Sequence, residues 1–217
     1  MASPAAVSRR TPRERASAPP RASKGEVTRA QILAAAVEQA SASGFESLTI
    51  GTLAERTGLS KSGLFAHFGS KLELQLAALD EAARQFTEGV FLPALKVPRG
   101  VKRLRALFDH WLSWPRRAHL PGGCPIDAAS REYQHQAGPM RDAVIERQKQ
   151  LDQGLRRAIQ LAIDTGELSP KADAQQIAFD FVGLILALSR AEMVLGHEEA
   201  RRRAREAFER LLRSNAA

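Results

Sequence analysis

Apolar residues recur at helical spacing along almost the whole chain, and this periodicity constrains the fold more than any other feature. The first apolar stripe predicts a helix that Gly44 ends, and it consists of Ile32, Leu33, Ala36, Val37 and Ala40. Further stripes predict helices within residues 101–114, 139–166, 173–195 and 198–213. No segment shows a convincing run of the period-two alternation that is typical of strands. The sequence therefore predicts an all-α fold.

Residues 50–68 contain two short predicted helices joined by the tripeptide Gly58-Leu59-Ser60. A steep crossing of two helices needs a small residue at the contact, which Ala54 supplies, and a corner residue that tolerates positive φ, which Gly58 supplies. Ser60 can cap the second helix and leave its N-terminal turn electropositive. We expect three leucines to fill the wedge between the helices, namely Leu53, Leu59 and Leu64.

This arrangement is typical of a helix-turn-helix, in which Lys61–His67 is the recognition helix that enters the major groove of DNA. The pattern alone also fits an αα-corner in another kind of helical protein. A helical protein-interaction module without sequence-specific DNA binding is therefore the alternative. On this interpretation the chain has three parts: a disordered basic arm at 1–24, a helix-turn-helix domain at 25–71 and a helical remainder at 72–217.

The residues around the corner extend the pattern. They are Thr28–Ala36, Gly44-Phe45, Leu48–Ile50, Leu53-Ala54, Thr57–Ser60, Gly63–Phe65, His67-Phe68 and Ser70-Lys71. This pattern closely resembles the N-terminal domain of the tetracycline-repressor (TetR) family, and the two-part helical layout is similar to that family's architecture. The resemblance implies an N-terminal three-helix DNA-binding domain and a C-terminal helical domain that dimerises and binds a small-molecule effector.

The resemblance assigns base reading to the start of the recognition helix, at Lys61, Ser62 and Gly63. The chemistry of these residues agrees with that role. Lysine can donate to guanine or to phosphate, and serine can hydrogen-bond to either kind of partner. Gly63 has no side chain, so the helix backbone can approach the groove closely.

Four further residues match family positions that lie at DNA phosphates: Thr49, Phe65, His67 and Lys71. Thr49 stands where the family caps the first helix of the motif and contacts phosphate. Phe65 stands where the family usually has a phosphate-binding tyrosine, so one hydroxyl donor is lost. His67 matches a phosphate contact, although a surface histidine packed on Phe68 is the alternative.

The net charge of +8 is concentrated at the N-terminus. Residues 1–24 contain six basic residues and one acidic residue, whereas acids and bases balance within residues 25–71. The composition of the first segment favours disorder, and its prolines oppose the amphipathic helix of an organellar transit peptide. We interpret residues 1–24 as an arm on DNA phosphates in preference to an inert tail, because such arms gain affinity by counterion release.

The segment Ile177–Leu188 is apolar nearly all round, so it must be buried on more than one side. It is too short to cross a bilayer. Pairing with a second copy, together with the last helix, would bury this segment in a four-helix interface, and an ordinary core helix is the alternative. A homodimer would also present two recognition helices about 34–36 Å apart to a palindromic operator.

Aromatic and polar residues of the middle helices supply material for an effector pocket. The resemblance implies a cavity among them, and the candidates are Phe108, Trp111, Trp114, Tyr133 and Phe179, with Phe86, Phe91 and Arg190 as further material. Each residue taken singly fits the core better than a ligand contact. The aromatic content favours an apolar or planar effector, and no cofactor is expected.

Two segments begin like enzyme motifs, but neither completes the motif. Gly58-x₄-Gly63 begins like a phosphate-binding loop, but Leu64-Phe65 follow where lysine and serine or threonine are required. His197–Arg201 ends in arginine where a zinc-protease motif needs histidine, and the other histidines lack metal-ligand spacing. Cys124, the single cysteine, indicates a reducing compartment and is interpreted as structural rather than redox-sensing. We therefore expect a soluble, cytoplasmic, ligand-responsive regulator that acts as a repressor by default.

Overall fold

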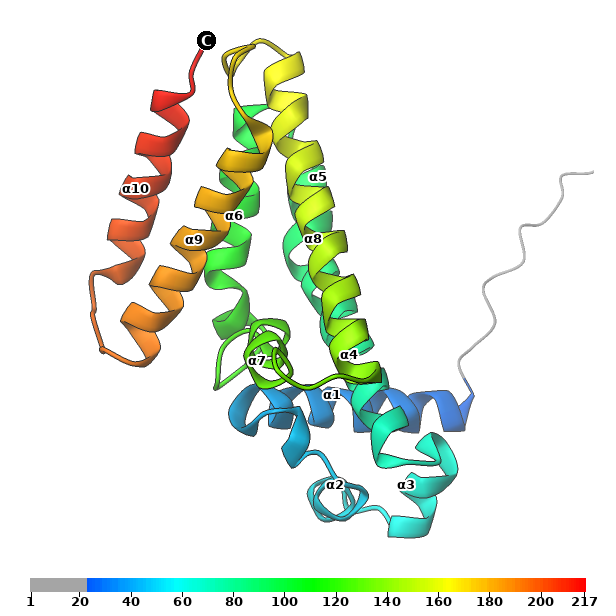
Figure 1. The fold of residues 1–217 in the computed structure, drawn as a ribbon. Helices are drawn as coiled ribbons and strands as arrows, with labels where there is room; N and C mark the ends of the chain where they lie inside the picture. Colours follow the sequence, from blue (N-terminus) through cyan, green and yellow to red (C-terminus); the bar gives the residue numbers. More distant parts are fainter. Residues whose placement is uncertain (1–22) are drawn as a thin grey trace, which may run out of the picture.

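The computed structural model describes residues 23–217, and every regular element within them is a helix (Figure 1). The N-terminal part consists of α1 (Lys24–Ser43), the 3-10 helix η1 (Phe45–Ser47), α2 (Ile50–Thr57) and α3 (Lys61–Phe68). The remainder consists of α4 (Lys71–Phe86), the π-helical turn η2 (Thr87–Phe91), α5 (Leu92–Leu95), α6 (Val101–Arg117), α7 (Pro125–Glu132), α8 (Pro139–Asp164), α9 (Ala174–Met193) and α10 (Ala200–Ser214). The prediction of an all-α fold is confirmed.

A capping box starts α1 one residue before the end of the predicted arm. The Ser23 hydroxyl accepts the Glu26 backbone N–H, and the Glu26 carboxylate accepts the Ser23 backbone N–H at 2.6 Å. Of the last two residues of the predicted arm, Ser23 is therefore the N-cap of α1 and Lys24 its first residue. The rest of the predicted arm, residues 1–22, lies outside the described residues.

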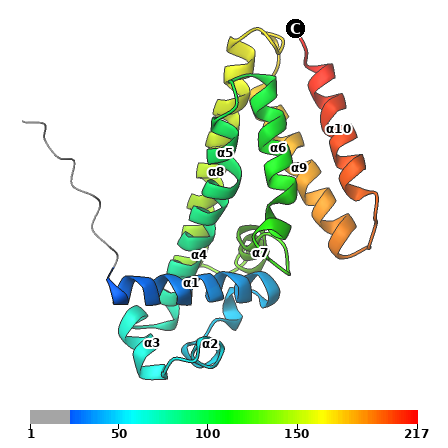
Figure 2. The same cartoon turned by 180° about the vertical axis from the view of Figure 1, so that it is seen from behind.

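The short helices α2 and α3 gather with α1 at one end of the molecule, and the long helices α4, α6, α8, α9 and α10 occupy the rest (Figures 1 and 2). The predicted apolar face of α1 is fully buried, from Ile32 to Ala40, and packs mainly on α4. Since α4 runs from α3 into the long-helix part, it joins the two parts of the chain.

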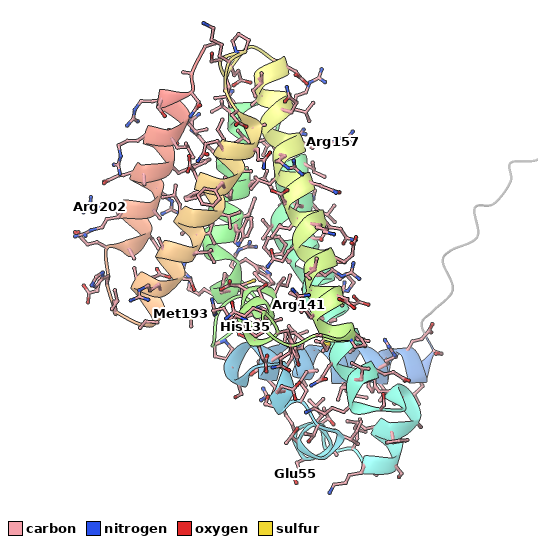
Figure 3. The ribbon with its side chains drawn as sticks, viewed as in Figure 1. Glu55, His135, Arg141, Arg157, Met193 and Arg202 are labelled. Carbon is pink, nitrogen blue, oxygen red and sulfur yellow. The ribbon has the colours of Figure 1, made fainter. Side chains whose placement is uncertain are left out.

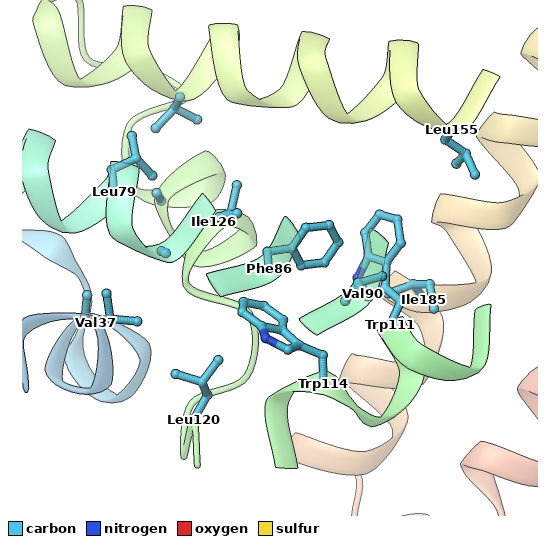
Figure 4. Packing of buried hydrophobic residues seen from close by; sticks show 14 of the residues in the cluster. Val37, Leu79, Phe86, Val90, Trp111, Trp114, Leu120, Ile126, Leu155 and Ile185 are labelled. Carbon is cyan, nitrogen blue, oxygen red and sulfur yellow. The ribbon is translucent and has the colours of Figure 1, made fainter. Parts of the chain in front are cut away.

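The turn η2 lets Trp114 pack closely against the backbone. Pro93 has no N–H, so the Gly89 carbonyl receives no helical bond from it and instead accepts the Arg117 guanidinium at 2.7 Å. A Cβ on Gly89 would lie 2.8 Å from the Trp114 ring, which shows how closely the indole approaches. Figure 4 shows Trp114 and Trp111 on either side of Phe86, with ring centroids 5.0 and 4.9 Å from the Phe86 centroid.

A second aromatic cluster ties α6, α9 and α10 together. Phe108 stacks on Phe208 with centroids 4.2 Å apart, and the edge of Phe181 meets both rings. The prediction that the helix containing Phe108 ends at Trp114-Pro115 is wrong by one turn, because Pro115 lies inside α6. A proline there removes only one hydrogen bond, which the last turn of a helix tolerates.

Candidate DNA interface and effector cavity

The corner between α2 and α3 has the geometry that its sequence predicts. Gly58 has φ +68° in the left-handed region, and its N–H donates to the Ala54 carbonyl. Leu53 and Leu64 are fully buried between the helices. Leu59 is 36% exposed, so the prediction that it fills the wedge is wrong: at the corner itself it lies at the surface.

The start of α3 presents an exposed polar surface. The Ser60 hydroxyl caps the helix by accepting the Gly63 N–H at 3.0 Å. Lys61, Ser62 and Gly63 are all exposed, while Leu64 and Phe68 anchor the opposite face of the helix in the core. The three predicted base-reading residues are therefore open to solvent, on a helix that lies at the end of the molecule formed by α2 and α3 (Figure 1).

The four predicted phosphate contacts have different surroundings. The Thr49 hydroxyl caps α2 through the Thr52 N–H at 3.1 Å, and Phe65 is 55% exposed. His67 is half-buried with its ring centroid 6.3 Å from that of Phe68, which is the packing considered as its alternative role. Lys71 donates to the Glu46 carboxylate at 2.7 Å, so a phosphate contact by Lys71 requires exchange of this partner.

The Glu132 carboxylate joins α7 to the DNA-binding end. Its two oxygens accept the backbone N–H groups of Phe45 and Glu46, each at 2.8 Å. Gly44 precedes these amides with φ +81°, and a Cβ there would lie 2.9 Å from the carboxylate. Both the backbone conformation and the close approach therefore favour glycine at this position. No sequence pattern pointed to Glu132, because its partners lie 86 and 87 residues away.

Tyr133, a predicted pocket residue, extends the same junction. Its hydroxyl donates to the Glu46 carboxylate at 2.8 Å, and the other oxygen of that carboxylate accepts Lys71. Hydrogen bonds from Lys71 and Tyr133 hold the pKa of Glu46 below its usual value. Burial and the bond to Glu46 raise the pKa of Tyr133, which stays a neutral donor.

A buried serine makes the third contact of this junction. The Ser41 hydroxyl donates to the Gly123 carbonyl at 2.8 Å and accepts the Gly122 N–H at 3.0 Å. A Cβ on Gly122 would lie 1.6 Å from the Ser41 carbonyl oxygen, so only glycine fits. The loop before α7 thus lies directly against the end of α1.

A cavity of about 570 Å³ lies among α4, η2, α5, α6, α7, α8, α9 and the start of α10. This volume is within the range of small-molecule sites. Its apolar lining includes Phe86, Phe91, Leu92, Trp111, Leu151 and Ile185. Met193, which also lines it, lies at the α7 end of α9 (Figure 3). Four residues of α7 and its N-cap contribute as well, namely Cys124, Ile126, Asp127 and Ser130.

The comparison with known families agrees with both halves of this architecture. Residues 32–78 match the family described as "Bacterial regulatory proteins, tetR family", and residues 100–208 match "Tetracyclin repressor-like, C-terminal domain". The chain belongs to the TetR family. This family consists of transcriptional regulators, so the prediction of a DNA-binding regulator rather than an enzyme is confirmed.

Three individual proteins that are similar to this TetR-family regulator illustrate the range of the resemblance. A TetR regulator from Chloroflexus aurantiacus J-10-FL is 28% identical with a TM-score of 0.77, over 89% of this chain and 99% of that chain. AibR, solved in complex with isovaleryl coenzyme A and operator DNA, has a TM-score of 0.68 at 23% identity, over 85% and 98% of the two chains, and so shows the fold alone. The transcriptional activator FasR of Mycolicibacterium smegmatis is 37% identical over 81 residues, which are 37% of each chain.

Of the five predicted pocket residues of this TetR-family regulator, only Trp111 lines the cavity. Phe108 is buried in the aromatic cluster with Phe208, and Trp114 packs over Gly89. Tyr133 turns toward Glu46 and borders a separate, shallow groove beside α8. Phe179 is 74% exposed on α9 and so cannot line an internal site. Phe86 and Phe91 do line the cavity, whereas Arg190 lies on the exposed side of α9.

Burial suppresses the reactivity of the one cysteine. Desolvation raises the pKa of Cys124 to about 12, so its thiol stays protonated at neutral pH. This agrees with the structural interpretation of the residue. Among residues 23–217, no three metal-ligating side chains gather, and no helix has the length and apolarity that crossing a membrane requires.

Proposed function

We propose that the chain is a ligand-responsive regulator that binds a palindromic operator as a homodimer and changes its DNA affinity when a small molecule fills the cavity. One observation carries the proposal. Helix α7 and its N-cap line the cavity at Cys124, Ile126, Asp127 and Ser130, and the same helix ends at Glu132, which holds η1 of the DNA-binding end. A ligand that displaces α7 therefore acts on the helices that carry the recognition surface.

The geometry of the junction supports this coupling. The bonds from Glu132 and Tyr133 are directional, and the Ser41 contact leaves no free space at Gly122. A shift of α7 must either move α1 and η1 with it or break these contacts. Either outcome changes the orientation of α3 relative to the long helices. The AibR complex, with both an acyl-coenzyme A and operator DNA, is consistent with a fold of this kind serving both ligands.

Exposed apolar residues on α9 support the homodimer. Phe179 and Leu186 of α9 are 74% and 44% exposed, and its C-cap Val194 is 71% exposed. A Cβ added to Gly183 would meet no atom within 4 Å. These residues recur at helical spacing and so share one face. Burial of this exposed apolar face against α9 of a second copy of the chain explains it best. A dimer also supplies the two recognition helices that a palindromic operator needs.

Repression is the proposed sign of regulation. A dimer on its operator blocks access to a promoter, and a ligand that changes the spacing of the two recognition helices releases it. Activation is the second candidate, supported by the activator FasR, to which 81 residues of this chain are similar. Transcription in vitro from a promoter that carries the selected operator separates the two. A DNA target and the single cysteine both favour action in the cytoplasm.

Operator selection tests the proposed DNA contacts. Duplexes selected from random DNA should share a palindrome, and Lys61→Ala or Ser62→Ala should relax or abolish this preference. Lys96→Ala, an exposed lysine at the end of α5, is the matched control and should leave the preference unchanged. If both recognition-helix variants keep the wild-type footprint, the proposed reading surface is wrong. A monomer without preference for any duplex would favour the protein-interaction alternative.

A further inference from the structure

The cavity wall is mainly apolar but carries four formally charged side chains. Asp127 comes from α7, Arg147 from α8, Glu192 from α9 and Arg201 from α10. Their charges decide which ligands the cavity accepts, because an ionised group loses its hydration when it enters such a site. Two acids and two bases leave these lining residues with no formal net charge.

Each of these charges already has a partner within the protein. Arg147 pairs with Asp80 of α4 at 2.6 Å, and Asp127 pairs with Arg131 one turn further along α7. Among the described residues, no charged side chain of the cavity wall lacks an ion-pair partner. A ligand carboxylate, phosphate or ammonium would therefore compete with an existing pair rather than neutralise a waiting charge.

The pair between Glu192 and Arg201 is the strongest of the three by geometry. The guanidinium donates through Nε at 2.5 Å and through Nη2 at 2.7 Å to the two carboxylate oxygens. Its remaining nitrogen, Nη1, donates to the Leu112 carbonyl of α6 at 2.9 Å. Arg201 thus fixes α10 against α6 and α9 with every terminal nitrogen occupied. An anionic ligand would therefore meet a guanidinium whose charge a bidentate carboxylate already neutralises.

The neutral polar side chains of the cavity wall can make only a small number of hydrogen bonds to a ligand. Gln148 donates to the Ser130 hydroxyl at 2.6 Å, and Ser130 donates in turn to the Ile126 carbonyl. The Gln148 side-chain carbonyl and the Ser189 hydroxyl have no partner among the described residues. An uncharged ligand with one hydroxyl or carbonyl group matches this inventory.

We infer that the effector is an uncharged, predominantly apolar molecule that makes one or two hydrogen bonds in the cavity. The inference rests on the proposed function, since it names the chemical class of the ligand for the same site. It differs from an acidic or phosphorylated effector, for which the wall provides no unpaired cation.

The charge rule, namely that the cavity binds an uncharged ligand more tightly than a charged one, is tested with two compounds of equal chain length. The neutral dye Nile red is bound to the full-length protein and displaced by decan-1-ol or by decanoate at neutral pH. Tryptophan fluorescence is a second readout of occupancy, because Trp111 lines the cavity. Decan-1-ol should displace the dye, and decanoate should do so at least about tenfold more weakly, because its charge finds no free partner. Equal or stronger binding of decanoate overturns the proposed ligand class.

Release of one partly buried cation should remove most of the preference for decan-1-ol. Glu192→Gln leaves Arg201 without its carboxylate and should raise decanoate binding by about tenfold relative to decan-1-ol. Asp80→Asn releases Arg147 from the opposite wall and provides a second variant of the same kind. Glu198→Gln, an exposed residue outside the cavity, is the control and should leave both affinities unchanged. If decanoate binding does not rise in either cation-releasing variant, the charge rule is overturned.

The same measurements distinguish failure of the proposed function from failure of the ligand class alone. If neither lipid displaces the dye from the wild-type protein, and neither changes its affinity for the selected operator, the cavity is not an effector site and the ligand class is overturned with it. If decanoate binds as well as decan-1-ol and changes operator affinity, the proposed function stands and only the ligand class is overturned.

Discussion

Glu132 Oε2 accepts the Phe45 backbone N–H at 2.8 Å, and this bond fixes the end of α7 to the DNA-binding end of the molecule. The second oxygen accepts the next amide along the chain, that of Glu46. Two successive amides bound by one carboxylate satisfy donors that begin the short helix η1. The cavity wall and the DNA-binding helices thus share one rigid connection.

Glu132→Gln should weaken this connection. Glutamine keeps one acceptor oxygen, but its amide group places a donor against the second backbone N–H. We expect the free energy of unfolding to fall by about 1–3 kcal/mol, as measured by urea denaturation. Glu198→Gln, which changes an exposed glutamate in the same way, should have no measurable effect. Equal stability of the two variants would contradict the proposed connection.

Gly122→Ala should disrupt the junction between α1 and the loop before α7. The new methyl group would lie 1.6 Å from the Ser41 carbonyl oxygen, so the backbone must move and the buried Ser41 bonds must lengthen. We expect a loss of about 3 kcal/mol in thermal or urea unfolding. Gly25→Ala in the first turn of α1 meets no atom within 4 Å and should change stability by no more than about 1 kcal/mol. A similar cost at both positions would show that crowding at Gly122 is not the cause.

Phe179→Glu should dissociate the proposed homodimer. A charge on the exposed α9 face would be buried without a partner on association. Sedimentation equilibrium should then give the mass of a monomer, and operator affinity should fall because only one recognition helix engages at a time. Gln153→Glu on the exposed surface of α8 is the control and should keep the wild-type mass. A dimer that survives Phe179→Glu would move the interface elsewhere.

Glu46 should contribute to the dependence of stability on pH. Its hydrogen bonds to Lys71 and Tyr133 lower its pKa in the folded state, so the folded protein binds this proton more weakly than the unfolded chain does. The stabilisation is therefore complete above the ordinary glutamate pKa and is lost as the pH falls through the lowered value. We expect the stability difference between wild type and Glu46→Gln to shrink as the pH decreases from about 5 to about 3. A difference that stays constant over this range would rule out the contribution.

Removal of residues 1–22 should weaken binding to all DNA sequences alike. This segment contains five arginines and one glutamate, and the deletion keeps the Ser23 cap of α1 intact. If the arm lies on phosphates, the slope of log K against log salt should decrease in magnitude by about 0.9 for each phosphate that the arm no longer neutralises. A filter-binding titration of operator and random duplexes measures both slopes. An unchanged slope would identify the arm as an inert tail.

Local sequence signals were sufficient for α1, α6, α8, α9, α10 and the DNA-binding corner, but they did not predict α7. The spacing of Ile32 to Ala40 predicts the buried face of α1, and the caps at Thr49 and Ser60 and the left-handed Gly58 predict α2, α3 and their turn. These features depend on interactions between residues a few positions apart, so the chain encodes them wherever it folds. The family pattern around the corner follows from the same short-range requirements.

The tertiary structure alone decided which side chains meet. Trp111 and Trp114 are three residues apart on one helical face, yet only Trp111 lines the cavity while Trp114 packs over Gly89. Phe179 is exposed in a helix that is apolar nearly all round. Glu132 binds amides 86 and 87 residues away. Periodicity states which face of a helix is apolar, but the element that packs on that face depends on contacts between distant segments, which a single sequence does not specify.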